Sequence, residues 1–339
     1  MSFRIRPANP NDFDAIYEMA KLTGGGFTNL PADKGTLVNK LSRSEVAFDK
    51  TEEAQGNDCY IFVLEDPREK IIRGTCQVFG MVGTAQAFYS YHLSTLTQWS
   101  PELGKTFRNQ MLTLTTDLEG SSEVGGLFLH PHLRAGGWGM LLARSRYLFI
   151  KAHRRRFGDR LLAELRGVMD EAGNSPFWDA LAGRFFDMTF PEADGFNAVN
   201  GTQFIADLMP KTPIYVSLLP DSAKAVMGQP HPTGRAALRM LQEEGMTFDR
   251  YIDIFDGGPT VTALTDQVRS IRESTEETVV EIGGDPGKSK VLLAAGRLRD
   301  FRCVRAEVRR LGRKGIAITR EAAELLEIET GARITMVAR

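Results

Sequence analysis

One stretch of this chain combines residue types that can hold an anion. Residues 134–139 read Arg-Ala-Gly-Gly-Trp-Gly, after a short apolar run at 124–129 and before 140–150, where apolar residues recur at helical spacing. Glycines let the backbone approach a ligand closely, and the first N–H groups of a helix have no partner within it. Those donors and the helix dipole favour phosphate. The pattern therefore predicts a phosphate-binding turn between a buried strand and a helix.

The spacing of this turn distinguishes between known phosphate loops. Arg-x-x-Gly-x-Gly, filled by Arg134, Gly137 and Gly139, resembles the pyrophosphate loop of the GNAT acyltransferases, which bind coenzyme A. A Walker loop needs Gly-Lys-Ser/Thr, and a Rossmann loop needs Gly-x-Gly-x-x-Gly directly after the strand, so neither fits. An ordinary glycine-rich connection is the remaining alternative. The turn and the strand before it predict these acyl-CoA contacts: Leu127, Phe128, Leu129, Arg134, Ala135, Gly136, Gly137, Trp138, Gly139 and Met140.

Composition excludes several classes of protein. The chain has 339 residues, 42% hydrophobic and 25% charged, which favours a globular protein of two or three domains. A net charge of −1 gives no field to attract nucleic acid or an anionic membrane. The three cysteines are far apart without a CxxC pair, and His130-Pro-His132 is expected to be a turn, so we expect no bound metal. Since no leader or long apolar run is evident, a cytoplasmic location is expected.

The order of predicted elements indicates the fold class. A strand at 3–7 precedes helices at about 13–20 and 32–48, then strands at 58–65 and 72–82, before the glycine turn. This is the order of a GNAT core, so we predict an α/β (α+β) fold with a mixed central sheet. The insertion at 84–122 is rich in aromatic and hydroxyl residues, and we expect a hairpin flap or a substrate lid there.

The remaining elements suggest three domains. A strand at 161–167, a helix at 177–186 and a strand at 185–190 would complete an acyl-CoA-binding GNAT domain over 1–190. Residues 191–270 partly echo this order, so we expect a second GNAT-like lobe carrying His231. Residues 271–339 are expected to form a small β-rich C-terminal domain, a barrel with strands at 291–295, 301–308 and 332–337 and a helix at 321–326.

Many short motifs, in one order along residues 3–270, resemble the arginine N-succinyltransferase family. The resemblance implies transfer of succinyl from the co-substrate succinyl-CoA to the α-amine of arginine, in arginine catabolism. Some members also take ornithine, and some act as two related chains, one with a degraded phosphate loop. The intact loop here resembles the competent type. The motifs include Ser121-Ser-Glu123, Leu127-Phe-Leu129, Ala163-Glu-Leu-Arg-Gly167, Ser175-Pro-Phe-Trp178, His231-Pro232 and Tyr251-Ile-Asp-Ile-Phe-Asp-Gly-Gly-Pro259.

Two residues are candidates for proton transfer. His231 lies in a rigid Pro-His-Pro loop, and an ordinary pKa near 6.5 suits transfer at neutral pH. The resemblance implies that His231 is the proton donor and that Leu127 contacts succinyl-CoA; the alternative for His231 is a structural hydrogen bond. Many GNAT enzymes use a tyrosine near the last helix of the core as the acid. The corresponding helix here begins Pro176-Phe177-Trp178 and has no tyrosine. Glu123 is the candidate base, or a cap of the turn before it.

The two charged ends of the substrates need partners of opposite charge. Planar carboxylates suit a guanidinium, so Glu164, Asp170, Glu171 and Asp253 are candidates. Arg166 could bind the succinyl carboxylate or pair with Glu164. No cysteine lies near a motif, which predicts direct transfer in a ternary complex. Ornithine as amine, acetyl-CoA as donor, or a non-catalytic subunit are alternatives; a homo-oligomer or a paralogous partner chain remains possible.

Overall fold

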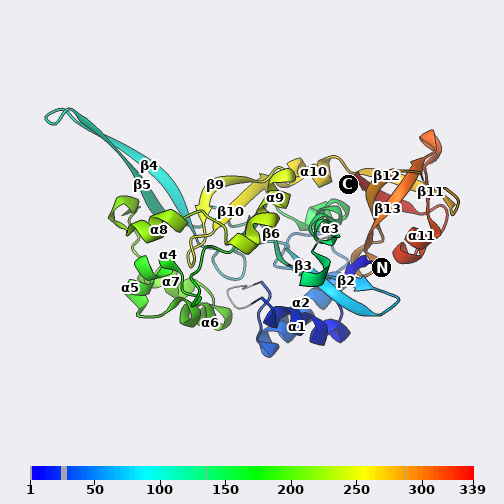
Figure 1. Cartoon of the computed structure of the whole chain (residues 1–339), viewed down its shortest axis with the longest axis horizontal. Coiled ribbons are helices and arrows are strands. Elements are labelled where there is room, and N and C mark those ends of the chain that lie inside the picture. The colour runs from blue at the N-terminus through cyan, green and yellow to red at the C-terminus, as the bar shows by residue number, and fades with distance from the viewer. Residues whose placement is uncertain (1, 24–28, 135, 286) are drawn as a thin grey trace.

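The computed structural model describes residues 2–23, 29–134, 136–285 and 287–339. Figure 1 shows an elongated molecule with a projecting hairpin at one end and a barrel at the other. The strands are β1 (Arg4–Pro7), β2 (Cys59–Asp66), β3 (Ile71–Phe79), β4 (Ser90–Ser100), β5 (Lys105–Thr115), β6 (Ser122–Leu129), β7 (Arg160–Glu164), β8 (Ile214–Tyr215), β9 (Thr247–Ile252), β10 (Pro259–Leu264), β11 (Thr275–Ile282), β12 (Ser289–Ala295), β13 (Arg302–Arg310), β14 (Ile316–Ile318) and β15 (Arg333–Ala338).

The helices cover both faces of the central strands. The α-helices are α1 (Phe13–Lys21), α2 (Lys34–Asp49), α3 (Trp138–Ala152), α4 (Pro176–Ala180), α5 (Gly183–Phe186), α6 (Phe190–Asn200), α7 (Gln203–Leu208), α8 (Asp221–Val226), α9 (Arg235–Glu243), α10 (Arg269–Arg272) and α11 (Arg320–Leu326). Among the described residues, none of these helices has the length and apolar character needed to cross a membrane.

Strand β2 shows how the core is layered. All eight of its residues are buried, and successive side chains alternate between two hydrophobic clusters. Cys59, Ile61 and Val63 pack with α1 and α2, whereas Tyr60, Phe62 and Leu64 pack with α3. A strand covered on both faces is continuously apolar rather than alternating. The predicted α/β class and the strand–helix–helix–strand–strand order of a GNAT core are confirmed.

The strands are hydrogen-bonded into one continuous sheet. Its order is β12-β15-β11-β14-β13-β1-β2-β3-β6-β7-β10-β9-β4-β5-β8. Strands β8, β9 and β10 therefore belong to the same sheet as the core, and the predicted second lobe has no separate sheet. The division of the chain at residues 190 and 270 stays a prediction. The predicted hairpin in the insertion is confirmed by the β4–β5 pair.

Three local predictions were wrong. The segment 185–190 is not a strand, because Thr189 and Glu192 form a capping box that starts α6 at Phe190. Strand β10 was missed although Pro259 is tolerated as the first residue of a strand. Strand β11 was also missed, because only Val279 among its residues is fully buried and the apolar alternation is weak.

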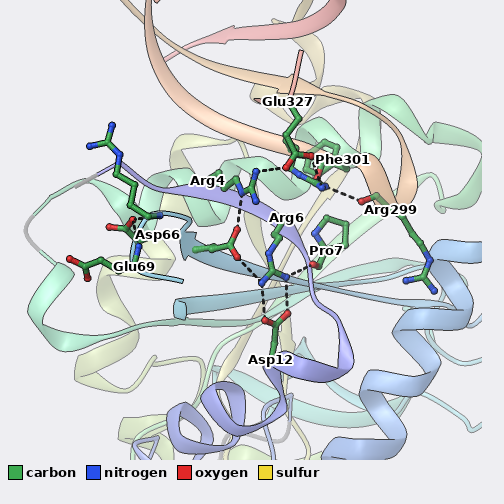
Figure 2. Close-up of polar contacts among 12 residues, drawn as sticks. Arg4, Arg6, Pro7, Asp12, Asp66, Glu69, Arg299, Phe301 and Glu327 are labelled. Carbon is green, nitrogen blue, oxygen red and sulfur yellow. Dashed lines mark hydrogen bonds and ion pairs between the residues drawn. The ribbon is translucent and has the colours of Figure 1, made fainter. Parts of the chain in front are cut away.

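The C-terminal domain is a closed barrel, as predicted, joined to the core by ion pairs. Strand β12 pairs with both β13 and β15, which closes the ring. Arg4 pairs with Glu65 (2.8 Å) in the core and with Glu327 (2.6 Å) in the barrel, and Figure 2 shows the pair with Glu327. Arg6 donates to both carboxylate oxygens of Asp12 and pairs with Glu65 at 3.0 Å. Asp12 therefore serves this network, and its side chain does not cap α1.

The network makes a prediction about stability and pH. Burial alone would raise the pKa of Glu65, but hydrogen bonds from Arg6 and Arg4 outweigh it and hold the pKa below its usual value. Glu65→Gln should therefore lower the free energy of unfolding by about 2 kcal/mol at pH 7. A lowered pKa stabilises only above the unfolded value of about 4.3. In urea titrations, the difference in free energy of unfolding between Glu65→Gln and wild type should shrink as the pH falls below about 4.3.

Glu321→Gln provides the matched control, because Glu321 pairs with Arg68 at 3.1 Å on the surface. Removing such an exposed pair should change stability by no more than about 1 kcal/mol. Equal losses for the two variants, or a Glu65→Gln loss that does not depend on pH, would contradict the role assigned to the buried pair.

Candidate active site

Strands β6 and β7 separate shortly after they meet. They are paired in parallel only at Ser122–Leu161 and Glu123–Leu162, although β6 continues to Leu129 and β7 to Glu164. Backbone N–H and C=O groups that face such an opening lack the strand partner they would otherwise have, and they must bind water or a ligand. Beyond Glu123 the ladder between β6 and β7 is therefore interrupted, and these backbone groups are left for other partners.

A bulge distorts β6 at the edge of this opening. Gly125 pairs with Gln77 and Phe128 with Thr75 on β3, so Gly126 and Leu127 together lie opposite Cys76. Gly126 has φ +56°, a left-handed conformation that favours glycine. Two residues facing one is the definition of a β-bulge, and bulges turn backbone groups out of the ladder. The predicted contacts Leu127, Phe128 and Leu129 begin at this bulge.

Glu123 is buried at the point where β6 and β7 diverge. Its side chain accepts a hydrogen bond from Asn29 Nδ2 at 2.7 Å. Burial raises the pKa of Glu123, although Asn29 and the charges of Lys40 and Arg146 oppose the rise. A carboxylate with a raised pKa that lies beside an opening can act as a base near neutral pH. The described contacts do not give it the turn-capping role that the sequence left open.

Asn29 organises polar groups beside the bulge, and the sequence analysis missed it. Its carbonyl accepts from Lys40 Nζ at 2.5 Å and from Gln77 Nε2 at 2.8 Å. Gln77 is fully buried, and its Oε1 has no partner among the described residues. A buried acceptor without a donor is rare unless a ligand or water supplies one. The neighbouring residues 24–28 lie outside the described residues.

Four carboxylates influence one another at the end of β7. Burial raises the pKa of Glu164 well above its usual value, and the charges of Asp253, Glu123 and Asp256 add to the rise. Burial and Asp253 likewise raise the pKa of Asp256 to about 8. Like charges this close disfavour joint ionisation, and a bound cation would relieve the repulsion. The predicted candidates Glu164 and Asp253 thus belong to one acidic group.

Asp256 belongs to the same group, and the sequence analysis did not single it out. Its two carboxylate oxygens accept from the backbone N–H groups of Gly167 (2.7 Å) and Gly258 (2.8 Å). A Cβ at Gly258 would lie 2.1 Å from the carbonyl oxygen of Leu165, so that close approach requires glycine. The Asp-Gly-Gly sequence was the available signal. Asp253 in turn accepts from the N–H groups of Phe255 and Asp256.

The other predicted substrate contacts have local roles. Asp170 is exposed and closes a turn by accepting from the N–H groups of Ala172 (2.9 Å) and Asn174 (2.8 Å). Glu171 is exposed in the same turn. Arg166 donates to Met169 Sδ at 2.8 Å, and no pair with Glu164 forms between these described residues. Burial lowers the pKa of Arg166.

His231 is tied to the segment that follows β7. Its N–H donates to the carbonyl of Arg166 at 2.7 Å, and Pro230 forms a bridge with Gly167. Its ring Nδ1 lies 2.7 Å from Thr233 Oγ1 and accepts from Thr233 N–H at 3.3 Å, which assigns the proton of the neutral ring to Nε2. Burial and the charge of Arg166 lower the pKa of His231.

The predicted phosphate turn leads into α3. Gly137 occupies the N-cap position with φ +74°, which requires glycine, and Trp138 begins the helix. Gly139 and Met140 lie in the first turn of α3. Arg134 Nε lies 3.5 Å from the carbonyl of Leu129. Ala135 lies outside the described residues. The strand–turn–helix order predicted for an anion site is therefore confirmed.

Arg146 was missed by the sequence analysis. It is 3% exposed on α3 and donates to the carbonyls of Ala143 (3.1 Å) and Gly125 (3.3 Å). Among the described residues it forms no ion pair, whereas its buried neighbour Arg144 pairs with Glu244 at 2.9 Å. Buried arginines are rarely unpaired. The signal was a cation in the apolar stripe of α3, between Leu142 and Ile150.

Comparisons with known proteins point to one family. A model described as arginine N-succinyltransferase beta subunit matches residues 3–270, and one for its C-terminal domain matches 276–338. The arginine N-succinyltransferase subunit beta of Pseudomonas aeruginosa is 38% identical over 98% of this chain and 97% of its own length. The arginine N-succinyltransferase of Citrobacter koseri is 39% identical over 98% and 96%. The solved structure of arginine/ornithine succinyltransferase subunit AI from Pseudomonas aeruginosa has a TM-score of 0.91 at 35% identity, covering 99% of this chain and 98% of that one.

The bulge in β6 can be tested with Gly126→Ala. A Cβ at Gly126 would lie 2.6 Å from Gln77 Cδ and Nε2, so the buried amide must move. The left-handed backbone adds about 1–2 kcal/mol of strain for alanine. We expect the free energy of unfolding to fall by about 2 kcal/mol, measured in urea. Gly195→Ala, in open space on α6, is the control and should be neutral or stabilising. Equal stability of Gly126→Ala and wild type would contradict the assigned bulge.

Proposed function

The chain belongs to the arginine N-succinyltransferase family, and we propose that it transfers the succinyl group of succinyl-CoA to the α-amine of L-arginine. The observation that carries the proposal is the opening between β6 and β7, with the bulge at Gly126 on one side and the glycine turn at its far end. A pantetheine arm between the strands would join a diphosphate at the turn to a thioester near the bulge.

The bulge would stabilise the transition state of acyl transfer. Attack of an amine on the thioester puts negative charge on the carbonyl oxygen. Backbone N–H groups around Leu127, turned out of the ladder by the bulge, are the proposed donors to that oxygen. Each such donor contributes about 3 kcal/mol in enzymes that use one. No covalent acyl-enzyme is required, because the three cysteines are buried and carry no partner for nucleophilic catalysis among the described residues.

Two residues would handle the protons. The α-ammonium of arginine must lose one proton before attack, and a second leaves the nitrogen as the amide forms. Glu123, a buried carboxylate with a raised pKa, is the proposed base for the first. His231 is neutral at pH 7 because its pKa is lowered. It would take up the second proton and donate it to the departing thiolate, which becomes the thiol of CoA.

The acidic group would recognise the guanidinium. Burial raises the pKa values of Glu164, Asp253 and Asp256, and the charge of Asp253 adds to the rise at Glu164 and Asp256. A cation among them would favour their ionised forms. A fork of N–H donors fits planar carboxylates in a way that an ammonium does not. Ornithine is the second candidate amine, because subunit AI from Pseudomonas aeruginosa, 35% identical, is an arginine/ornithine succinyltransferase. That resemblance also supports a partner subunit, since related chains are named as subunits.

The succinyl carboxylate needs a cation close to the thioester, and Arg146 is the proposed partner. Its guanidinium reaches Gly125 beside the bulge and lacks an ion pair among the described residues. Arg166, the residue suggested by the sequence, instead contacts Met169 and lies near Asp256 and Asp194. The carboxylate of the succinyl group would neutralise the buried guanidinium of Arg146. Acetyl-CoA has no such carboxylate, so this contact would favour succinyl-CoA.

The reaction is tested by release of CoA from succinyl-CoA when arginine is supplied. The purified chain should be active, and His231→Ala should lower kcat by about 10²-fold or more. The wild-type rate should fall on acidification, at a midpoint below the ordinary histidine value of about 6.5, because only the neutral ring can accept a proton. The fall of the rate at low pH should be altered in His231→Ala. Near-normal turnover by His231→Ala would remove the histidine from the mechanism.

Selectivity for the acyl group tests Arg146. Arg146→Met should lower kcat/KM for succinyl-CoA by about 10²-fold, while acetyl-CoA is affected far less, because an uncompensated carboxylate is costly to bury. The ratio of kcat/KM for succinyl-CoA to kcat/KM for acetyl-CoA is measured on one preparation, so it does not depend on the fraction of folded protein. Arg144→Gln is the control on the same helix and should leave the ratio unchanged. If Arg166→Gln changes the ratio and Arg146→Met does not, the succinyl carboxylate binds at Arg166.

A further inference from the structure

The barrel and the phosphate turn enclose a pocket of about 430 Å³. It lies where β12, β13 and the end of β15 meet the segment before α3, beside the C-terminal end marked in Figure 1. Neither the sequence analysis nor the proposed function gives the barrel a chemical role. The pocket is lined by Gly136, Lys290, Arg305, Ala306, Glu307 and Arg339.

Two arginines of the barrel border the turn directly. Arg305 donates to the carbonyl of Gly136 at 2.8 Å, and its guanidinium carbon lies 4.1 Å from the centre of the Trp138 ring. Trp138 is in turn packed edge-on against Phe3, which fixes the ring. Arg339 Nη2 lies 2.6 Å from the position of a Cβ at Gly137, the N-cap of α3. Both guanidinium groups therefore stand next to the backbone that is predicted to hold a diphosphate.

The pocket carries an excess of positive charge. Its lining side chains are three cations and one carboxylate, and Glu307 lies directly opposite Lys290 in the β12–β13 pair. Among the described residues, Arg305 and Arg339 form no ion pair. Other arginines of the barrel do, since Arg302 pairs with Glu327 and Arg309 with Glu281. Burial and the charge of Arg339 lower the pKa of Arg305, so the two guanidiniums repel one another.

We propose that the C-terminal barrel completes the phosphate site of the acyl-CoA, with Arg305 and Arg339 binding phosphate oxygens at the nucleotide end. This inference rests on the proposed function. An arginine fork matches the geometry of phosphate oxygens, and Arg305 is held in place by Trp138 and Gly136 before any ligand arrives. An anion between the two guanidiniums would remove their repulsion. The phosphate can be the 3′-phosphate of the ribose or the diphosphate, and these are separable by experiment.

The test is calorimetry with CoA and with 3′-dephospho-CoA. Arg305→Gln and Arg339→Gln are each expected to weaken binding of CoA by about 10-fold or more. If the arginines hold the 3′-phosphate, the wild type should prefer CoA to dephospho-CoA, and the variants should lose that preference. If they hold the diphosphate, the variants should lose affinity for both ligands alike. Unchanged affinity for CoA in both folded variants would overturn the proposal.

A matched control removes the same charge elsewhere on β13. Arg310→Gln lies outside the pocket and loses a pair with Glu277 instead. It should leave CoA binding within about twofold, because exposed charges at a distance are screened. Since Arg305 also contacts Trp138, a failure of Arg305→Gln to fold leaves Arg339→Gln as the deciding variant. CoA binding that depends on these arginines, in a chain that does not succinylate arginine, would refute the proposed function and leave this inference standing.

Discussion

The separation of β6 from β7 after only two matched residue pairs is the constraint on which the proposed site depends. Had the ladder continued past Glu123 and Leu162, its backbone groups would be bonded to one another and closed to a ligand. The bulge at Gly126 and the unpartnered amide oxygen of Gln77 lie beside the same opening. The pairing pattern of two strands therefore places the bulge, the unpartnered amide oxygen and the end of the β6–β7 ladder in one region of the sheet.

The charged residues around that opening are opposite in sign to the charged groups of the proposed substrates. Glu123, Glu164 and Asp256 have raised pKa values because burial disfavours their ionised forms, and Arg146 is buried without an ion pair among the described residues. Such an arrangement is unfavourable for the ligand-free protein and favourable once a guanidinium and a carboxylate enter. The protein would thus give up some stability where the proposed ligands bind.

The C-terminal barrel contacts the core through an ion-pair network and beside the glycine turn, in addition to the pairing of β13 with β1. Arg4 on β1 pairs with Glu65 of the core and with Glu327 of the barrel, and Glu327 also pairs with Arg302 within the barrel. With Arg6 and Asp12, this network has three arginines and three carboxylates. The pocket around Arg305 and Arg339 has an excess of positive charge beside the turn before α3. A balanced network supports the fold, whereas an excess of positive charge favours the binding of an anion.

The sequence alone determined most of the local elements, including the glycine turn before α3. Gly137 and Gly139 at the start of an apolar helix predict unpaired N–H donors, and that inference needs only a few neighbouring residues. The tertiary structure decided which distant side chains meet. No local pattern marks Asp256, Asn29, Arg146 or Arg305 as part of a site. Asp170 was a reasonable candidate from the sequence, but in the structure its carboxylate closes a turn. Burial and long-range pairing create those environments, and neither is set by spacing along the chain.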